Sequence, residues 1–167
     1  SGARVTMTDA GGNALPSACF VDPAQQNQVT TADGGYRFDI FPGANAACPT
    51  TETEYRITVQ APAGYASTPS ANHPPLSGPL DITACVFDAV PGGACQPAAE
   101  ATPPSGPATL PYLLALLMQS GDPNVIHNHI PLDPFASTGN VSITKVAASP
   151  TLRRGERMGY TIRVTNK

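Results

Sequence analysis

Proline and glycine recur along the whole chain, and they constrain its fold more than any other feature. The 167 residues include 19 prolines and 15 glycines. Both residue types interrupt long helices, because proline lacks the amide hydrogen and glycine loses much conformational freedom on folding. They do not recur with the three-residue period that a collagen helix requires. The composition therefore predicts short strands joined by many tight turns.

Alternating apolar and polar residues predict where the strands lie. Residues 36–41 and 55–59 alternate strictly, and turn signals that contain Gly or Pro bound each segment. Further strands are predicted at residues 3–8, 18–21, 28–31, 80–87, 125–132, 141–146 and 158–165. Short strands with frequent turns indicate an all-β chain folded as an Ig-like β-sandwich, whose long Pro-rich loops span residues 66–79 and 88–107.

Residues 110–119 allow two interpretations. Their Leu, Ala and Met residues favour a helix. A continuous apolar run of this length is equally compatible with a strand buried on both faces. Local propensity alone favours the helix.

The charge pattern argues against two classes of partner. The net charge is -3, and the nine Lys and Arg residues are scattered along the chain. Nucleic-acid binding needs a basic face or stripe, which this pattern lacks. The longest apolar run, at residues 110–118, is far shorter than the roughly 20 residues of a membrane-spanning helix. We therefore expect neither a nucleic-acid partner nor a membrane span.

The four cysteines, Cys19, Cys48, Cys85 and Cys95, indicate disulfides. None forms a CxxC pair, and an even number in a chain of this composition is typical of an oxidising compartment. Three pairings are possible, and proximity favours Cys19–Cys48 with Cys85–Cys95. Each such link contributes about 3 kcal/mol in the chain-entropy model. The alternative is four buried free thiols in a cytosolic protein. We expect an extracellular or cell-surface protein.

The C-terminal segment is too short to be a complete domain. We expect a sandwich at residues 1–135, a linker at 136–139 and a separate segment at 140–167. A lone two-stranded hairpin is marginally stable in water, so the apolar face of this segment needs a partner. The segment either begins a second domain or donates strands that complete another sheet. The residues predicted to donate are Val141, Ile143, Tyr160, Ile162 and Val164.

Two stretches of the first domain resemble a known family. TTADGGYRFDIFPG at residues 30–43 and YRITVQAPAGY at residues 55–65 are similar to the SdrD B-like and Cna B-type modules of bacterial surface proteins. The resemblance covers residues 3–66. It implies a seven-stranded, prealbumin-like sandwich that stacks with its neighbours into a stalk.

The C-terminal segment resembles a second element of such proteins. VSITKVAASPTLRRGERMGYTIRVTN at residues 141–166 looks like the start of a conserved repeat domain. NHIPLDP at residues 128–134 resembles the end of a module that precedes such repeats, where the strand before it is extended. This resemblance changes the prediction for residues 110–119 to a strand. The cysteines and the insert at residues 66–106 are not typical of Gram-positive versions, so we expect a Gram-negative origin.

Two groups of side chains are candidate metal ligands. SdrD B-like modules often bind calcium through acidic loops, and Asp9, Asp33 and Asp39 would be the ligands here. The alternative is that Asp33 only shapes a hairpin turn. His127 and His129, with Asp133, could bind zinc or copper, the alternative being structural histidines. We expect no other cofactor.

No catalytic motif is present in the sequence, so we expect a protein that is not an enzyme. There is no GxSxG motif, and no cysteine lies in an environment that favours a thiolate. The leading hypothesis is a stalk or fibre module whose partners are neighbouring domains or identical subunits. A second is an adhesive module that binds an extracellular glycan or host protein through its Pro-rich loops. A third is an enzyme-associated sandwich with the same Asp-Gly-x-Tyr-x-Phe turn, because fold alone does not fix function.

Overall fold

The chain divides into two compact units, Ser1–Phe135 and Ala136–Lys167, which are described separately. The structure is a computed structural model, and it describes residues 2–66, 70–84, 94–103, 110–135, 141–147 and 160–166. The predicted linker at 136–139 falls outside these ranges. Regular structure in the described ranges consists of strands and two short 3-10 helices. The all-β prediction is therefore confirmed.

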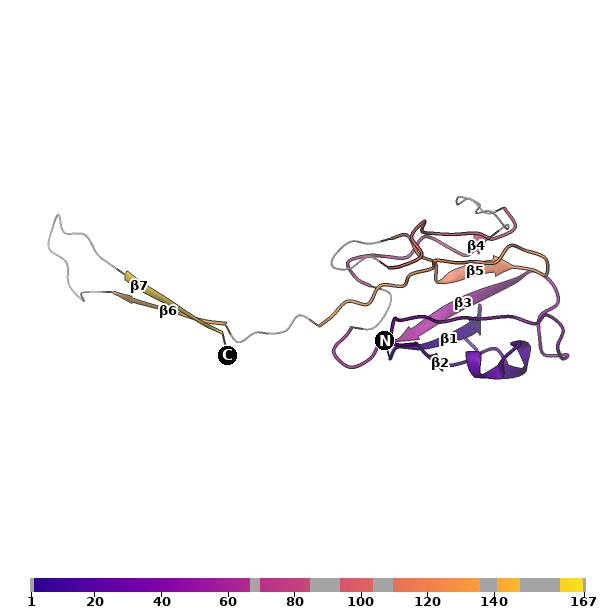
Figure 1. Cartoon of the computed structure of the whole chain (residues 1–167), viewed down its shortest axis with the longest axis horizontal. Helices are drawn as coiled ribbons and strands as arrows, with labels where there is room; N and C mark the ends of the chain where they lie inside the picture. The colour runs from indigo at the N-terminus through magenta and orange to yellow at the C-terminus, as the bar shows by residue number, and fades with distance from the viewer. Residues whose placement is uncertain are drawn as a thin grey trace. The chain divides into compact units, whose positions relative to one another are not determined.

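The first unit is built on a five-stranded sheet (Figure 1). The strands are β1 (Arg4–Asp9), β2 (Gln28–Val29), β3 (Thr53–Gln60), β4 (Leu80–Asp81) and β5 (Ala115–Met118). Their order across the sheet is β2-β1-β3-β5-β4. Neighbours are antiparallel, except that β4 runs parallel to β5. The central strands β1, β3 and β5 thus come from distant parts of the chain.

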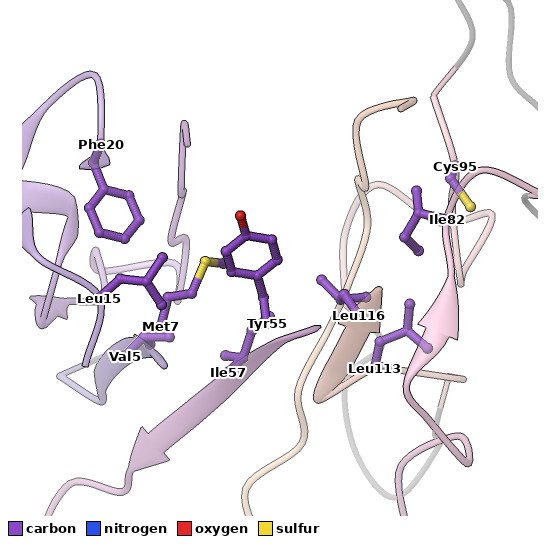
Figure 2. Close-up of a cluster of buried hydrophobic side chains, with 10 residues drawn as sticks. All are labelled: Val5, Met7, Leu15, Phe20, Tyr55, Ile57, Ile82, Cys95, Leu113 and Leu116. Carbon is purple, nitrogen blue, oxygen red and sulfur yellow. The ribbon is translucent and has the colours of Figure 1, made fainter. Parts of the chain in front are cut away.

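Strand alternation places the core on one face of this sheet. Val5 and Met7 of β1 are buried, and Met7 lies opposite Ile57 of β3. Cross-strand pairs of this kind stabilise a sheet because their side chains touch on one face. Figure 2 shows the core residues of β1 on one side and those near β4 on the other, with β3 and Leu116 between them. The cluster comprises Val5, Met7, Leu15, Phe20, Tyr55, Ile57, Ile82, Cys95, Leu113 and Leu116.

A second layer of extended segments covers part of this face, and this completes the sandwich. Residues 36–40 and 125–130 pack against the core without forming a ladder. With other described residues, their pairing is limited to isolated bridges, Phe20 with Ile40 and Cys95 with Val125. The strands predicted at 36–41 and 125–132 are therefore wrong as ladder strands. His127 has a φ of +54°, which interrupts the extended run at 125–132.

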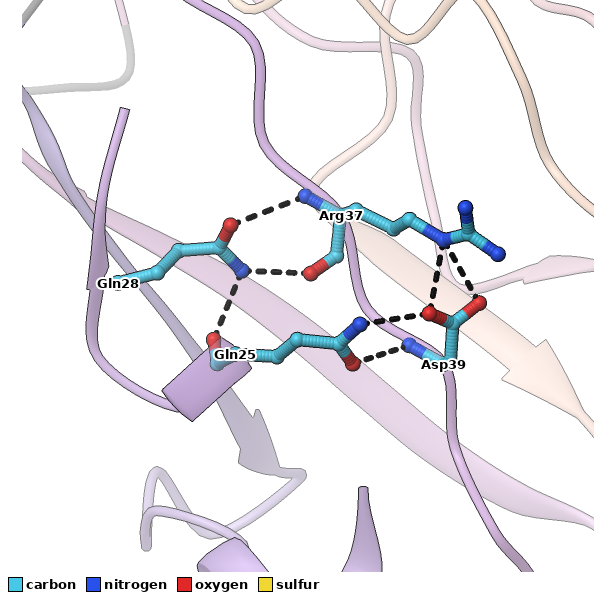
Figure 3. Close-up of polar contacts among 4 residues, drawn as sticks. All are labelled: Gln25, Gln28, Arg37 and Asp39. Carbon is cyan, nitrogen blue, oxygen red and sulfur yellow. Dashed lines mark hydrogen bonds and ion pairs between the residues drawn. The ribbon is translucent and has the colours of Figure 1, made fainter. Parts of the chain in front are cut away.

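Glutamine side chains explain why residues 36–41 form no ladder (Figure 3). Gln28 Nε2 donates to the carbonyl oxygen of Arg37 at 2.6 Å, and the amide of Arg37 donates to Gln28 Oε1 at 3.0 Å. The amide of Asp39 donates to Gln25 Oε1 at 2.7 Å. A side-chain amide offers the same donor and acceptor as a peptide group. The two glutamines thus occupy the place of a neighbouring strand.

The remaining predicted strands differ in their outcome. Residues 18–21 contain the 3-10 helix η1 (Ser17–Cys19), so the strand predicted there is wrong. A second 3-10 helix, η2 (Pro23–Gln25), follows it. The prediction at 28–31 shortens to β2, and the one at 80–87 to β4, although residues 85–87 are outside the described chain. The strand within 110–119 is confirmed as β5.

The second unit is an antiparallel two-stranded ladder. It consists of β6 (Val141–Ala147) and β7 (Tyr160–Asn166). Both strands fall where alternation predicts them. The register pairs Ile143 with Val164 and Lys145 with Ile162.

Candidate functional site

A disulfide joins η1 to the chain that follows residues 36–40. Cys19 and Cys48 are bonded and buried, with their Cα atoms 5.3 Å apart. The bond closes a loop with a sequence separation of 29 residues. This is the pairing that proximity in the sequence favours. Cys95 is also disulfide-bonded. Because Cys85 falls outside the described residues, the predicted Cys85–Cys95 pairing stays a prediction.

The three aspartates predicted to bind calcium stabilise separate local structures. Asp9 accepts a hydrogen bond from the amide of Asn13 at 2.9 Å. Asp33 accepts one from the Thr31 hydroxyl, which closes a turn. Asp39 pairs with Arg37 at 2.7 Å. Within the described ranges, no three or more His, Cys, Asp or Glu side chains form a group that could hold a metal ion.

These hydrogen bonds also set the titration of the three carboxyl groups. The side chain of Asn13 lowers the pKa of Asp9, and the Thr31 hydroxyl lowers that of Asp33. The Arg37 side chain lowers the pKa of Asp39. In each case a donor favours the charged form. The three aspartates therefore make separate local contacts, those of Asp9 and Asp33 within turns, and among the described residues they do not form one group that could hold a calcium ion.

The histidine pair fixes one segment to another. His127 Nδ1 lies 3.3 Å from the carbonyl oxygen of Ala98, and His129 Nε2 lies 2.7 Å from that of Glu100. The two rings stack with centroids 6.2 Å apart. Asp133 bonds elsewhere, because it accepts from the Ser70 hydroxyl at 2.6 Å. The arrangement thus matches the structural alternative for these histidines.

A buried polar contact joins the second layer to the chain just before β5. Leu113, which is fully buried, donates its amide to Asn128 Oδ1 at 2.7 Å, and Asn128 Nδ2 donates to the Leu113 carbonyl at 3.0 Å. Asn128 Nδ2 also donates to the Tyr36 hydroxyl at 3.1 Å. Burial of the Tyr36 ring raises the pKa of its hydroxyl. Sequence analysis missed this contact, because a single asparagine carries no pattern.

A cleft of about 1150 Å³ lies between the sheet and the second layer. The core face of the sheet contributes Met7, Tyr55 and Leu116 to its wall. The second layer contributes residues 33–40 and 124–130. The charged residues among the described lining are Asp33, Arg37, Asp39 and Asp122. The cleft therefore combines an apolar floor with a net negative border.

One face of the ladder of the second unit carries most of its exposed apolar side chains, together with Lys145, which lies opposite Ile162. Ile143, Ile162 and Val164 are 68%, 63% and 63% exposed. Residues directly opposite each other share a face of the ladder. The register thus places these three and the positions of Val141 and Tyr160 on one face.

The other face of the ladder carries Thr144 opposite Arg163 and Val146 opposite Thr161. It is the more polar of the two faces. The five residues predicted for strand donation therefore share a face by register. Whether they pair with another molecule stays a prediction.

Comparison with known proteins yields no relatives. No family model, no curated protein and no solved structure matches the chain. Among the described residues, no helix is long and apolar enough to cross a membrane.

Proposed function

We propose that this chain is a structural module, a stalk or fibre subunit, of an exported bacterial surface protein of the SdrD B-like or Cna B-type kind. In this proposal the β6–β7 ladder joins it to a neighbouring domain or to an identical subunit. The observation that carries the proposal is the apolar face of the ladder, on which Ile143, Ile162 and Val164 are exposed. The Cys19–Cys48 disulfide supports an oxidising, extracellular location.

The stability of the ladder depends on what covers this face. Burying a Val or Ile side chain contributes about 1.5–3 kcal/mol relative to leaving it exposed. A two-stranded ladder alone is marginally stable, so contact with a partner stabilises both the ladder and the association. Strand addition satisfies the open main-chain edge and the apolar face at once.

The module acts mechanically in this proposal and is not an enzyme. His127 and His129 are bonded to main-chain carbonyl oxygens, which fits a structural role. The disulfide and the side-chain amides that pair with main-chain groups make the first unit rigid. Rigidity is what a stalk requires.

The experiment compares point variants on the two faces of the ladder by sedimentation velocity of the full chain. Ile162→Lys and Val164→Lys place a charge on the apolar face. Thr161→Lys and Thr165→Lys add the same charge to the polar face of the same strand, β7, and serve as matched controls. We expect the wild type and the controls to associate with increasing concentration and the apolar-face variants to remain monomeric. Equal behaviour of the two sets contradicts the proposal.

A second candidate function is adhesion, and two exposed aromatic residues favour it. Tyr65 is 42% exposed and Phe135 is 64% exposed. They lie close together, because Tyr65 bridges to Pro134 and the amide of Phe135 donates to the carbonyl of Gly64 at 2.9 Å. Adjacent aromatic residues beside a Pro-rich loop could hold a glycan or a host protein. Retention on immobilised extracellular-matrix glycans, lost in Tyr65→Ser and Phe135→Ser, would support this function.

A further inference from the structure

Within the part of the chain that the structure describes, residues 36–40 are hydrogen-bonded along one edge only. The amide groups of Arg37 and Asp39 are paired with glutamine side chains, and the amide of Val21 donates to the carbonyl of Asp39 at 2.8 Å. In an extended chain, successive residues direct their main-chain groups to opposite edges. The main-chain groups of Tyr36 and Phe38 therefore lie on the other edge. They make no hydrogen bond to any residue in the described part of the chain.

This open edge borders the cleft. Tyr36 and Phe38 line the cleft together with the apolar residues of β1, β3 and β5 that form its floor. Phe38 is itself half-buried, packed against the core cluster, with its ring 5.7 Å from that of Phe20. An unpaired main-chain edge beside an apolar surface is a template for an added strand. The strand it accepts must carry apolar side chains at every second position.

We infer that the cleft is an acceptor for β7 of a second copy of this chain, whose free edge adds to the open edge at residues 36–40. This inference rests on the proposed function and identifies the surface to which the ladder binds. Within the described residues, β7 pairs only with β6, so its second edge is available. Ile162 and Val164 then lie over the apolar floor, and Arg163 lies on the outer side, where Arg37 and Asp39 are also directed.

Charge complementarity supports the same partner. The described lining of the cleft carries three aspartates and one arginine. Strands β6 and β7 carry Lys145 and Arg163 and contain no acidic residue. A basic strand is thus attracted to an acidic border.

The pattern of residues selects β7 over β6 as the donor. Lys145 lies on the same face of β6 as Ile143. Direct addition of β6 therefore brings a charged residue to the apolar side. In β7 the only charged residue, Arg163, lies on the face opposite Ile162 and Val164. Burying a charge is costly, so β7, which carries none on the side of Ile162 and Val164, is the better fit. Donor and acceptor are different surfaces, so the contact repeats from copy to copy and builds an open chain of subunits.

The test uses a fluorescent synthetic peptide of residues 158–167. The full-length chain is added to it at concentrations below those at which the chain associates with itself. We expect saturable binding by fluorescence anisotropy. Methylating the main-chain nitrogens at positions 161, 163 and 165 blocks one edge of the peptide, and methylating those at 160, 162 and 164 blocks the other. One of these two peptides should lose binding and the other retain it, because the added strand uses one edge.

Two further measurements locate the site. An Arg163→Glu peptide should bind about tenfold more weakly, which corresponds to about 1.4 kcal/mol. Amide exchange at Tyr36 and Phe38 should slow when the unmodified peptide is added. Absence of binding, an equal effect of both methylated peptides, or protection confined to β2 or β4 would overturn the inference. If the ladder variants abolish self-association while the peptide fails to bind at the cleft, the proposed function stands and the acceptor site is wrong.

Discussion

Asn128 takes both main-chain hydrogen bonds of Leu113 through a single side-chain amide. The two bonds are 2.7 Å and 3.0 Å long, and Leu113 is fully buried. The Tyr36 hydroxyl donates to the main-chain carbonyl of Asn128 at 2.8 Å, so the contact also reaches the other covering segment. One amide therefore holds together three parts of the chain that are far apart in sequence.

Replacing this amide should destabilise the first unit strongly. In Asn128→Ala the buried amide and carbonyl of Leu113 lose their partners, and each unpaired buried group costs about 1–3 kcal/mol. We expect the free energy of unfolding, measured by urea denaturation, to fall by about 3 kcal/mol. Asn124→Ala removes the same side chain at an exposed position nearby and should change it by less than about 0.5 kcal/mol. Equal effects would show that the contact with Leu113 is not formed.

Gln26 should be equally sensitive to loss of its donor group. Its Nε2 donates to the carbonyls of Met7 at 2.8 Å and Leu15 at 2.7 Å, and its Oε1 accepts from the amide of Met7 at 3.0 Å. Gln26→Glu keeps the shape but replaces both donors with an acceptor. We expect a loss of about 2 kcal/mol in unfolding free energy. Gln60→Glu, at the exposed end of β3, is the matched control and should have little effect.

The Cys19–Cys48 disulfide should contribute to stability mainly by restricting the unfolded chain. A double variant, Cys19→Ala with Cys48→Ala, tests this without reducing the disulfide of Cys95. We expect a loss of about 3 kcal/mol in unfolding free energy, since the closed loop is of moderate length. A double variant as stable as the wild type would contradict a stabilising role for the Cys19–Cys48 bond.

Asp133 should make the first unit sensitive to acid. The Ser70 hydroxyl holds the pKa of Asp133 below its ordinary value of 3.8. A depressed pKa in the folded state adds stability above the unfolded pKa, and this stability is lost as the pH falls from about 4 through the folded pKa. The melting temperature of Asp133→Asn should therefore lie below that of the wild type at pH 7, and the gap between them should narrow as the pH falls below about 4.

The control for this pH dependence is an exposed carboxylate. Glu52→Gln removes a charge from an exposed side chain and should leave the melting temperature close to that of the wild type from pH 7 to pH 2. A gap between Asp133→Asn and the wild type that stays constant over this range would show that Asp133 does not titrate with folding.

Strand positions were predictable where alternation coincided with a main-chain partner. The ladder strands β1, β3, β6 and β7 all lie at alternating segments. Residues 36–41 alternate just as strictly and pack one face on the core, yet side chains of Gln25 and Gln28 take the place of a neighbouring strand. Alternation predicts which face of a segment is buried. It does not predict which groups form hydrogen bonds with the main-chain amides and carbonyls.

The segment around β5 shows the opposite case. Its Leu, Ala and Met residues favour a helix locally, but pairing of Tyr55 with Leu116 across β3 and β5 places it in the sheet. Tertiary contacts outweigh a weak local preference, so only the family resemblance predicted the strand. The cleft was unpredictable for a related reason, because it depends on which main-chain edges remain open after folding.

The most direct test of the proposed function is sedimentation velocity of the full chain beside a chain that ends at residue 139. The account predicts that the full chain forms larger species as its concentration rises and that the shortened chain stays monomeric. Negative-stain images of the full chain should then show linear assemblies. If both chains remain monomeric at every concentration, the β6–β7 ladder does not join identical subunits, and the fibre hypothesis is wrong.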